Sequence, residues 1–163
     1  MSADIEKNAF SPNPTGYLFH ASIGAVAEAV AALSHGDARF KGFLCPETTS
    51  GSEDRRRFSM AKPFGRVNAY AVYFYKKKPA DYLAVFEVTL HAETKDRTQV
   101  QVSVNGPRIS VPGHGFNIHS FRFDQNRTIG VEATTIEEYE ILLGIGKILN
   151  ERGLPPLTRQ PLG

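Results

Sequence analysis

The strongest hydrophobic pattern in the chain covers residues 67–90, VNAYAVYFYKKKPADYLAVFEVTL. Two runs rich in β-branched and aromatic residues flank a short basic connector at 76–81. Runs of this kind are typical of buried β-strands. Both faces of the second run are apolar at first, and one face becomes polar from Glu87 onward. We therefore predict a hairpin of two buried strands at the centre of a sheet, with one face partly open to solvent.

A strict alternation follows over residues 99–104, QVQVSV, where valine occupies every second position. Asn105-Gly106 is a strong hairpin signal, because both residues tolerate a positive φ. Pro107 then assigns the returning segment to an edge or a bulged strand, because proline cannot donate a backbone hydrogen bond. Shorter strands are predicted at 17–22, 39–45, 108–111, 116–123 and 128–133.

An N-terminal helix is predicted over residues 23–33, IGAVAEAVAAL. Its larger apolar side chains recur every three or four residues, which places them on one helical face. Ser22 is suited to cap the start of this helix, and Gly36 is suited to the left-handed conformation that ends one.

Residues 134–152 carry helix signals at both ends. Two threonines are each followed three residues later by a glutamate, which is the capping-box pattern: Thr134 with Glu137, and Thr135 with Glu138. Gly153 and Pro155 are typical of the end of a helix. Apolar side chains cover more than one face, so we expect this helix to be deeply buried.

The polar stretch between residues 46 and 65 has no clear periodicity and is predicted to be a long loop. Loops of this length inside a compact domain are often functional. Ser52 precedes two acidic residues, which predicts a short helix over 52–60. A functional site is expected between this loop and the polar end of the 67–90 hairpin.

These elements predict an α+β fold. A mostly antiparallel sheet of about five to seven strands would carry an N-terminal and a C-terminal helix packed on it. The expected organisation is an extended arm at 1–15, a single domain at 16–153 and a proline-rich tail at 154–163.

The composition is that of an ordinary globular chain. Of 163 residues, 41% are hydrophobic and 22% are charged, and the net charge is only +2. This length suits one domain, and so small a charge does not demand a nucleic-acid partner. A single cysteine, Cys45, excludes an internal disulfide framework and a multi-cysteine metal site. No two histidines have the spacing of a common metal site, so no metal is predicted.

The chain has no apolar run of the ~18 to 20 residues that a membrane-spanning helix needs. Its first twenty residues lack the apolar core of a secretory signal peptide. We therefore expect a cytoplasmic location, or export by a route that uses no cleaved signal.

Two basic clusters, at 55–57 and 76–78, each place three positive charges at a loop or its edge. They could contact phosphate groups while tyrosines of the 67–90 segment stack on bases. This nucleic-acid hypothesis requires both clusters to lie on one face. The simpler alternative is that the clusters are solvated and the tyrosines belong to the core. Glu87 has two interpretations as well: an acid–base group in a pocket, or a residue on the solvent face.

Three further stretches contain candidate functional residues. Residues 17–22, YLFHAS, resemble the first-strand motif of the ADP-ribosyltransferase branch in which a histidine holds the nicotinamide ribose. Residues 47–50, ETTS, are similar to the Ser-Thr-Ser segment of the other branch of that family. Residues 138–143, EYEILL, resemble the Glu-x-Glu motif of that second branch.

The resemblance implies an NAD-dependent ADP-ribosyltransferase of the toxin or effector type. His20, Thr49 and Ser50 would then bind NAD. Glu140 or Glu138 would be catalytic, since a carboxylate stabilises the positive charge that develops as nicotinamide leaves.

The residues also leave open two other functions. One is a non-enzymatic module, such as an adaptor, an immunity-type inhibitor or a chaperone, that binds another protein through a sheet face or an exposed aromatic patch. The other is nucleic-acid binding through the two basic clusters. Whether the protein is an enzyme is not decided by the sequence.

Overall fold

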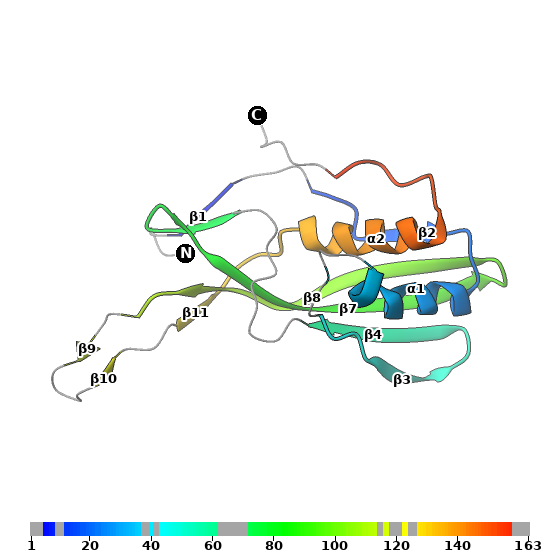
Figure 1. The fold of residues 1–163 in the computed structure, drawn as a ribbon, viewed down its shortest axis with the longest axis horizontal. Helices are drawn as coiled ribbons and strands as arrows, with labels where there is room; N and C mark the ends of the chain where they lie inside the picture. Colours follow the sequence, from blue (N-terminus) through cyan, green and yellow to red (C-terminus); the bar gives the residue numbers. More distant parts are fainter. Residues whose placement is uncertain are drawn as a thin grey trace.

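Two helices pack on one face of an antiparallel sheet, which confirms the predicted α+β fold (Figure 1). The computed structural model describes residues 5–8, 12–36, 40, 43–61, 72–113, 116–117, 122–123 and 127–157.

The main sheet has six strands, in the order β11–β8–β7–β4–β3, with β2 also paired to β8. They are β2 (Gly16–Phe19), β3 (Glu47–Ser52), β4 (Arg55–Ala61), β7 (Asp81–Thr94), β8 (Arg97–Val111) and β11 (Arg127–Gly130). Strands β2 and β11 share one edge of β8: β2 pairs with residues 98–101, and β11 pairs with residues 108–111. The long β7–β8 hairpin therefore forms the centre of the sheet.

A second, smaller sheet joins the beginning of the chain to its middle. It contains β1 (Ile5–Lys7), β5 (Tyr73–Tyr75) and β6 (Lys78–Pro79), in the order β1–β5–β6. The predicted N-terminal arm thus includes a strand. A further pair is formed by β9 (Phe116–Asn117) and β10 (Arg122–Phe123).

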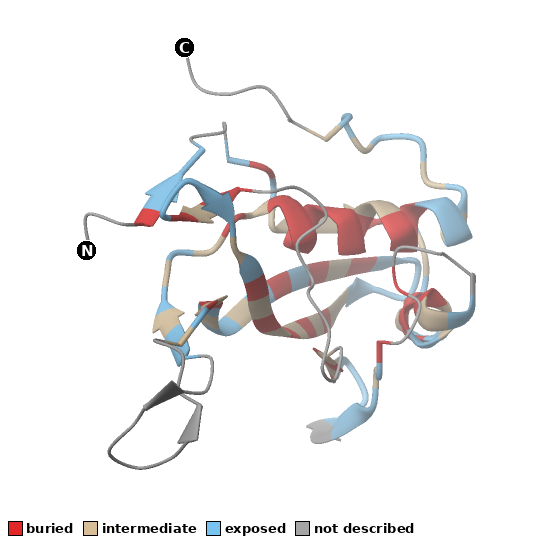
Figure 2. Ribbon diagram, turned by 60° about the vertical axis from the view of Figure 1, so that its left-hand side comes forward, coloured by how far each residue is buried: buried red, intermediate tan, exposed pale blue. Residues whose placement is uncertain are grey.

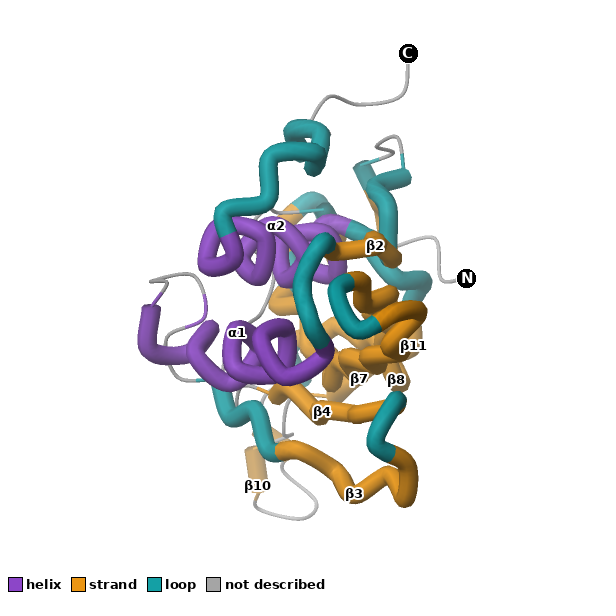
Figure 3. Tube along the Cα trace, turned by 90° about the vertical axis from the view of Figure 1, so that its right-hand side faces the viewer, coloured by secondary structure: helices purple, strands orange, loops and turns teal. Residues whose placement is uncertain are grey.

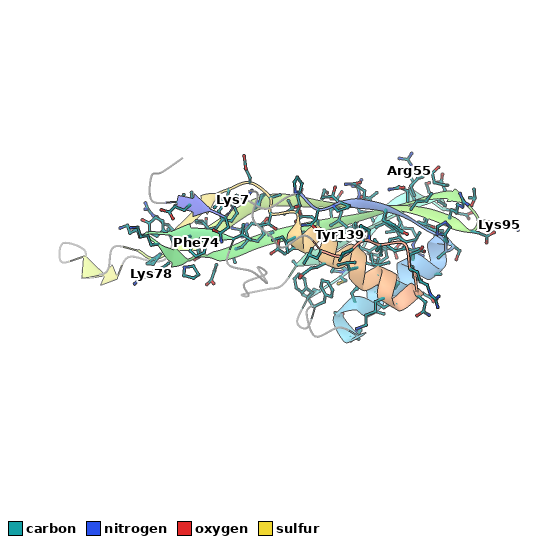
Figure 4. All side chains as sticks on the ribbon, turned by 90° about the horizontal axis from the view of Figure 1, so that it is seen from above. Lys7, Arg55, Phe74, Lys78, Lys95 and Tyr139 are labelled. Atoms are coloured by element: carbon teal, nitrogen blue, oxygen red, sulfur yellow. The ribbon has the colours of Figure 1, made fainter. Side chains whose placement is uncertain are left out.

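The helices are α1 (Ile23–Gly36) and α2 (Ile136–Leu149), and they lie side by side across the sheet (Figure 3). The Ser22 hydroxyl accepts a hydrogen bond from Ala25 N–H at 3.2 Å, so Ser22 caps α1 as predicted. The helices cover only the half of the β7–β8 hairpin nearer Lys95 (Figure 4). The small sheet lies towards the other half.

The core lies between the helices and the sheet. Every second residue of β7 is buried from Tyr82 to Leu90, so the buried residues lie on one face of the strand (Figure 2). Tyr73, Tyr75 and Tyr82 are 2%, 8% and 0% exposed, which confirms their predicted place in the core. Tyr70 lies outside the described residues.

The predicted 67–90 hairpin is wrong in its pairing. Strand β7 is central, as expected, but its neighbours are β4 and β8 rather than the preceding apolar run. The part of that run which the structure describes as a strand, β5, pairs with β1 and with β6. The basic connector makes the tight β5–β6 turn. Two apolar runs that are close in sequence therefore belong to different sheets.

Asn105-Gly106 forms a bulge and not the predicted hairpin turn. Strand β8 continues through both residues, and its register with β7 shifts between Leu83 and Val85. Gly106 has φ of +55°, which suits the left-handed residue of such a bulge. The hairpin turn lies earlier, at 95–96, because the strand that contains the alternating valines, β8, pairs antiparallel with the preceding strand β7.

The predicted loop at 46–65 and its helix at 52–60 are also wrong over the described residues. Strands β3 and β4 form a hairpin here. Phe58 and Met60 are buried and alternate with less buried positions, and both pair with residues of β7, so the period is that of a strand. Acidic residues near Ser52 belong to the hairpin turn.

Three shorter strand predictions are only partly confirmed. In 39–45 the described pairing is a single bridge between Leu44 and Ala61. In 116–123 the two ends pair as β9 and β10. The strand predicted at 128–133 is β11, which spans Arg127–Gly130.

Residues 136–149 are helical, but the predicted caps differ in detail. The Thr134 hydroxyl accepts a hydrogen bond from Ile136 N–H at 3.1 Å and donates to the Glu137 carboxylate. Thr135 has a left-handed backbone and caps nothing with its side chain, which instead accepts a hydrogen bond from Asn13 N–H. At the other end Asn150 is the left-handed cap, earlier than the predicted stop at Gly153.

Neither described helix is long and apolar enough to cross a membrane.

Candidate functional site

His20, the candidate NAD-binding residue, lies just after β2 and contacts Glu151, just beyond α2. His20 Nδ1 is 3.1 Å from Glu151 Oε1, and His20 N–H donates to Oε2 at 3.2 Å. Tyr17 also donates its hydroxyl to Oε1, at 3.1 Å. The His20 side chain is 61% exposed, whereas that of Glu151 is 12% exposed. These contacts tie the end of β2 to the C-terminal end of α2.

The charge state of Glu151 follows from these contacts. Burial favours its protonated form, but the hydrogen bonds from His20 and Tyr17 outweigh burial and lower the pKa of Glu151. Burial and the hydrogen bond to Glu151 raise the pKa of Tyr17. Sequence reasoning selected His20 but missed Glu151, which belongs to no motif and follows the helix cap.

The candidate catalytic residues Glu138 and Glu140 lie in the first half of α2 and are only 1% and 5% exposed. A helix rises about 1.5 Å per residue, so both lie roughly 15 to 20 Å from Glu151 along α2. The structure does not bring them together with His20. Thr49 and Ser50 belong to β3, whose side chains at these positions lie outside the described part. NAD binding and ADP-ribosyltransferase activity stay predictions.

Glu87 points away from the helices, on the open face of the sheet. Its carboxylate Oε1 is 3.3 Å from Arg57 Nε on the neighbouring strand β4. The solvent-facing interpretation of Glu87 is therefore confirmed. The same open face carries polar residues of β7 and β8, including Thr89 and Gln101, which are paired in register.

The two basic clusters lie far apart. Residues 55–57 begin β4, whereas residues 76–78 form the β5–β6 turn and the start of β6. Figure 4 shows Arg55 and Lys78 at opposite ends of the long axis. The two clusters do not make one continuous surface, as the nucleic-acid hypothesis required.

A cavity of about 330 Å³ lies beside the lysine turn. Its described lining residues come from two distant parts of the chain: Tyr75, Lys76, Lys78, Pro79 and Ala80 from the small hairpin, and Ser110, Pro112 and Gly113 from the end of β8. Pairing of Asp81 with Ser110 brings these segments together. We call this site the lysine-turn cavity.

Two cationic side chains contact Tyr75, and a third lines the same cavity. Lys76 Nζ is 5.4 Å from the centre of the Tyr75 ring, and Arg127 Nη2 donates to the Tyr75 hydroxyl at 3.2 Å. Lys78 lines the cavity from the next strand. Positive charge and apolar walls thus meet at one opening.

The backbone of the lysine turn is in an unfavourable conformation. Lys76 and Lys77 have φ of 49° and 64°, although neither is glycine or asparagine. A two-residue hairpin turn with positive φ at both positions usually contains Asn-Gly, and each other residue there costs about 1 kcal/mol. Strain of this kind is frequent where a side chain has a function.

The lysine cluster was visible in the sequence, but the cavity was not. The basic run at 76–78 is a local signal that the sequence shows directly. Ser110, Pro112 and Gly113 gave no signal of their own, because they reach the cavity only through the pairing of β7 with β8.

No metal centre is found in the described part of the chain, where no three His, Cys, Asp or Glu side chains are placed to hold an ion. Cys45 is partly buried, and burial raises the pKa of its thiol.

Comparison with known proteins finds no family that matches this chain and no match among curated proteins.

Proposed function

We propose that the protein is a binding module whose lysine-turn cavity takes a small ligand with a flat ring and a phosphate group. The observation that carries this proposal is the cavity of about 330 Å³ in which Lys76 and Lys78 converge beside Tyr75.

The size and the lining favour a small molecule. Pockets for small ligands have volumes of about 300 to 1,000 Å³, mostly apolar walls and a few converging polar groups. Pro79, Ala80 and Pro112 supply apolar walls suited to a planar ring, and Ser110 supplies a hydroxyl. A single ring system with a phosphate fits this volume.

The charge favours an anion. Lysine ammonium groups are frequent phosphate ligands, and hydrogen bonds to charged groups contribute about 1.5 to 3 kcal/mol each. Lys76 lies in the turn directly after Tyr75, and Lys78 is the strand partner of Tyr75. Both lysines line the cavity, so both can reach one phosphate.

The test is calorimetric titration with the four ribonucleoside monophosphates and the four matched nucleosides. We expect at least one monophosphate to bind, and its nucleoside to bind at least tenfold more weakly. The double variant Lys76→Gln, Lys78→Gln should weaken monophosphate binding by about 100-fold or more.

Lys95→Gln is the matched control, because Lys95 is an exposed lysine in a two-residue turn at the far end of the molecule (Figure 4). Lys77→Gln separates contact from general charge, since Lys77 shares the lysine turn but does not line the cavity. The proposal fails if no monophosphate binds, or if either control weakens binding as much as the double variant does.

A further inference from the structure

Four buried polar atoms without a hydrogen-bond partner gather at the start of α2. Among the described residues, the buried side-chain oxygens without a hydrogen bond of ordinary geometry are Tyr82 Oη, Glu137 Oε1, and both Oε1 and Oε2 of Glu138. Backbone N–H groups at the start of α2 lie near enough to lower the pKa of both glutamates, but they do not complete such a bond. Buried polar atoms are almost always paired in folded proteins, and an unpaired group often marks an ion or ligand. Here all of them belong to one cluster, which we call the α2 acid cluster.

Residues from three elements form this cluster. Glu137 and Glu138, from the first turn of α2, are 4% and 1% exposed. Tyr82 is the second residue of β7 and is fully buried. Its ring stacks on that of Tyr73 in β5, with centroids 6.1 Å apart and planes 9° apart. The charges of Glu138 and Glu137 both act on the Tyr82 hydroxyl, so the four atoms share one environment.

Positive charge is present beside the cluster but does not neutralise it. Lys7 Nζ lies 5.6 Å from the centre of the Tyr73 ring. Its ion-pair partner is Glu132, at 3.6 Å, whose side chain is 86% exposed. Lys7 lowers the pKa of Glu138 by its charge, yet it donates no hydrogen bond to either oxygen of that residue.

The missing partner has a definite chemistry. Three of the four atoms are carboxyl oxygens, which accept hydrogen bonds, so a group that donates several hydrogen bonds complements them, and above pH 7 a positive charge complements them further. Ammonium and guanidinium groups do both, with three and five N–H donors respectively. The neighbouring tyrosine rings also favour a cation over their faces.

We propose that the α2 acid cluster is a binding site for a small organic cation that carries a primary ammonium or guanidinium group. The cation donates to Glu138 and Glu137, and its alkyl part packs against Tyr73 and Tyr82. This site is separate from the lysine-turn cavity and has the opposite charge preference.

In this proposal the cation reaches the cluster beside the N-terminal strand. Strand β1 carries Lys7, is three residues long, and is paired with β5 alone among the described strands. Its displacement would therefore leave the pairing of the main sheet unchanged.

The test measures the melting temperature of the full chain at pH 8 with 10 mM propylammonium or methylguanidinium. Sodium chloride at the same ionic strength controls for screening. Tetramethylammonium controls for charge without N–H donors. We expect at least one N–H cation to raise the melting temperature by about 3 °C or more, and both controls to raise it by less than 1 °C.

Glu138→Gln keeps the shape of the side chain and removes its charge, so we expect the variant to fold and to lose this response. Glu132→Gln removes a nearby but exposed carboxylate and should retain the response. The proposal is overturned if neither N–H cation raises the melting temperature, if tetramethylammonium is as effective, or if Glu138→Gln responds like the unaltered protein.

Discussion

Glu137 and Glu138 occupy positions where a charged carboxylate is unfavourable. Burial raises the pKa of each from its ordinary 4.5 to about 7. The Thr134 hydroxyl lowers the pKa of Glu137, and backbone N–H groups at the start of α2 lower the pKa of both glutamates. Burial outweighs these effects. The folded chain therefore holds these protons more tightly than the unfolded chain does.

This shift predicts that the protein loses stability as the pH rises. The folded state binds more protons than the unfolded state between pH 4.5 and about 7, so the free energy of unfolding falls across that interval. Glu138→Gln removes one of the two charges. We expect this variant to be more stable than the unaltered protein by ~3 kcal/mol at pH 8, and to show no such gain at pH 4.5.

Urea unfolding at the two pH values measures this difference. Glu53→Gln is the control, because Glu53 is exposed in the β3–β4 turn and its removal should change stability equally little at both pH values. A gain from Glu138→Gln that is the same at pH 4.5 and pH 8 would show that the charge of Glu138 is not its cause.

Several residue roles were readable from the sequence and others were not. Ser22 and the buried tyrosines were identified because capping and hydrophobicity are local properties. The contacts of Glu151 with His20 and Tyr17 were missed, because each joins residues more than 130 positions apart. The burial of Glu137 and Glu138 was also missed, since a glutamate in the first turn of a helix is ordinarily solvated.

At the scale of elements, α2 owes its position to its glycines. Gly144 lies where α2 meets α1, and a Cβ atom built there would be 2.7 Å from Leu33 Cδ2 and 2.9 Å from Phe40 Cε2. Glycine weakens an isolated helix by about 1 kcal/mol relative to alanine. In α2 this loss is offset by the closer approach of two helices.

Gly144→Ala is therefore expected to destabilise the protein by about 1 to 2 kcal/mol, because overpacking exceeds the gain in helix propensity. Gly24→Ala is the matched change in α1, where a new Cβ atom meets nothing within 4 Å. This second variant should stabilise the protein by about 0.5 to 1 kcal/mol. Chemical denaturation of both variants measures the two effects, and two changes of the same sign would refute this account of Gly144.

The presence of elements was better predicted than their pairing. Hydrophobic periodicity predicted both helices and the strands β7 and β8, because a periodic pattern can be recognised within one short stretch of sequence. The bulge at Gly106 escaped prediction because Asn-Gly suits a hairpin turn and a bulge alike, and only the register with Leu83 and Val85 distinguishes them. The β3–β4 hairpin was missed because Phe58 and Met60 are its main apolar signal.

On the scale of the whole molecule, the fold has two unequal parts joined by the β7–β8 hairpin. One half carries both helices and most of the core, and the other is associated with the small β1–β5–β6 sheet (Figure 4). Ile5 is 8% exposed, and Asn8 N–H donates to the Val72 carbonyl at 2.8 Å, so β1 is attached by modest contacts. The sequence predicted the α+β class but could not show this division.

Removal of residues 1–8 should therefore weaken one part and spare the other. We expect a loss of about 2 kcal/mol, corresponding to one buried aliphatic side chain and a few edge hydrogen bonds. Hydrogen exchange followed by mass spectrometry should show faster exchange in β5 and unchanged protection in β7 and β8. Ile5→Ala gives a milder version of the same change. Uniformly faster exchange across the main sheet would mean that the two parts unfold together.

The pairing of β2 with β8 has a consequence for the order in which the chain is made. The hydrogen bond between Thr15 and Gln101 spans 86 positions, and β8 is the strand with which β2 pairs among the described residues. During synthesis Phe19 and the apolar face of α1 leave the ribosome long before β8 exists to receive them. Contacts of such long range slow folding, since a large loop must close first. The segment that forms β2 and α1 therefore cannot bury its apolar face against β8 until β8 has been synthesised.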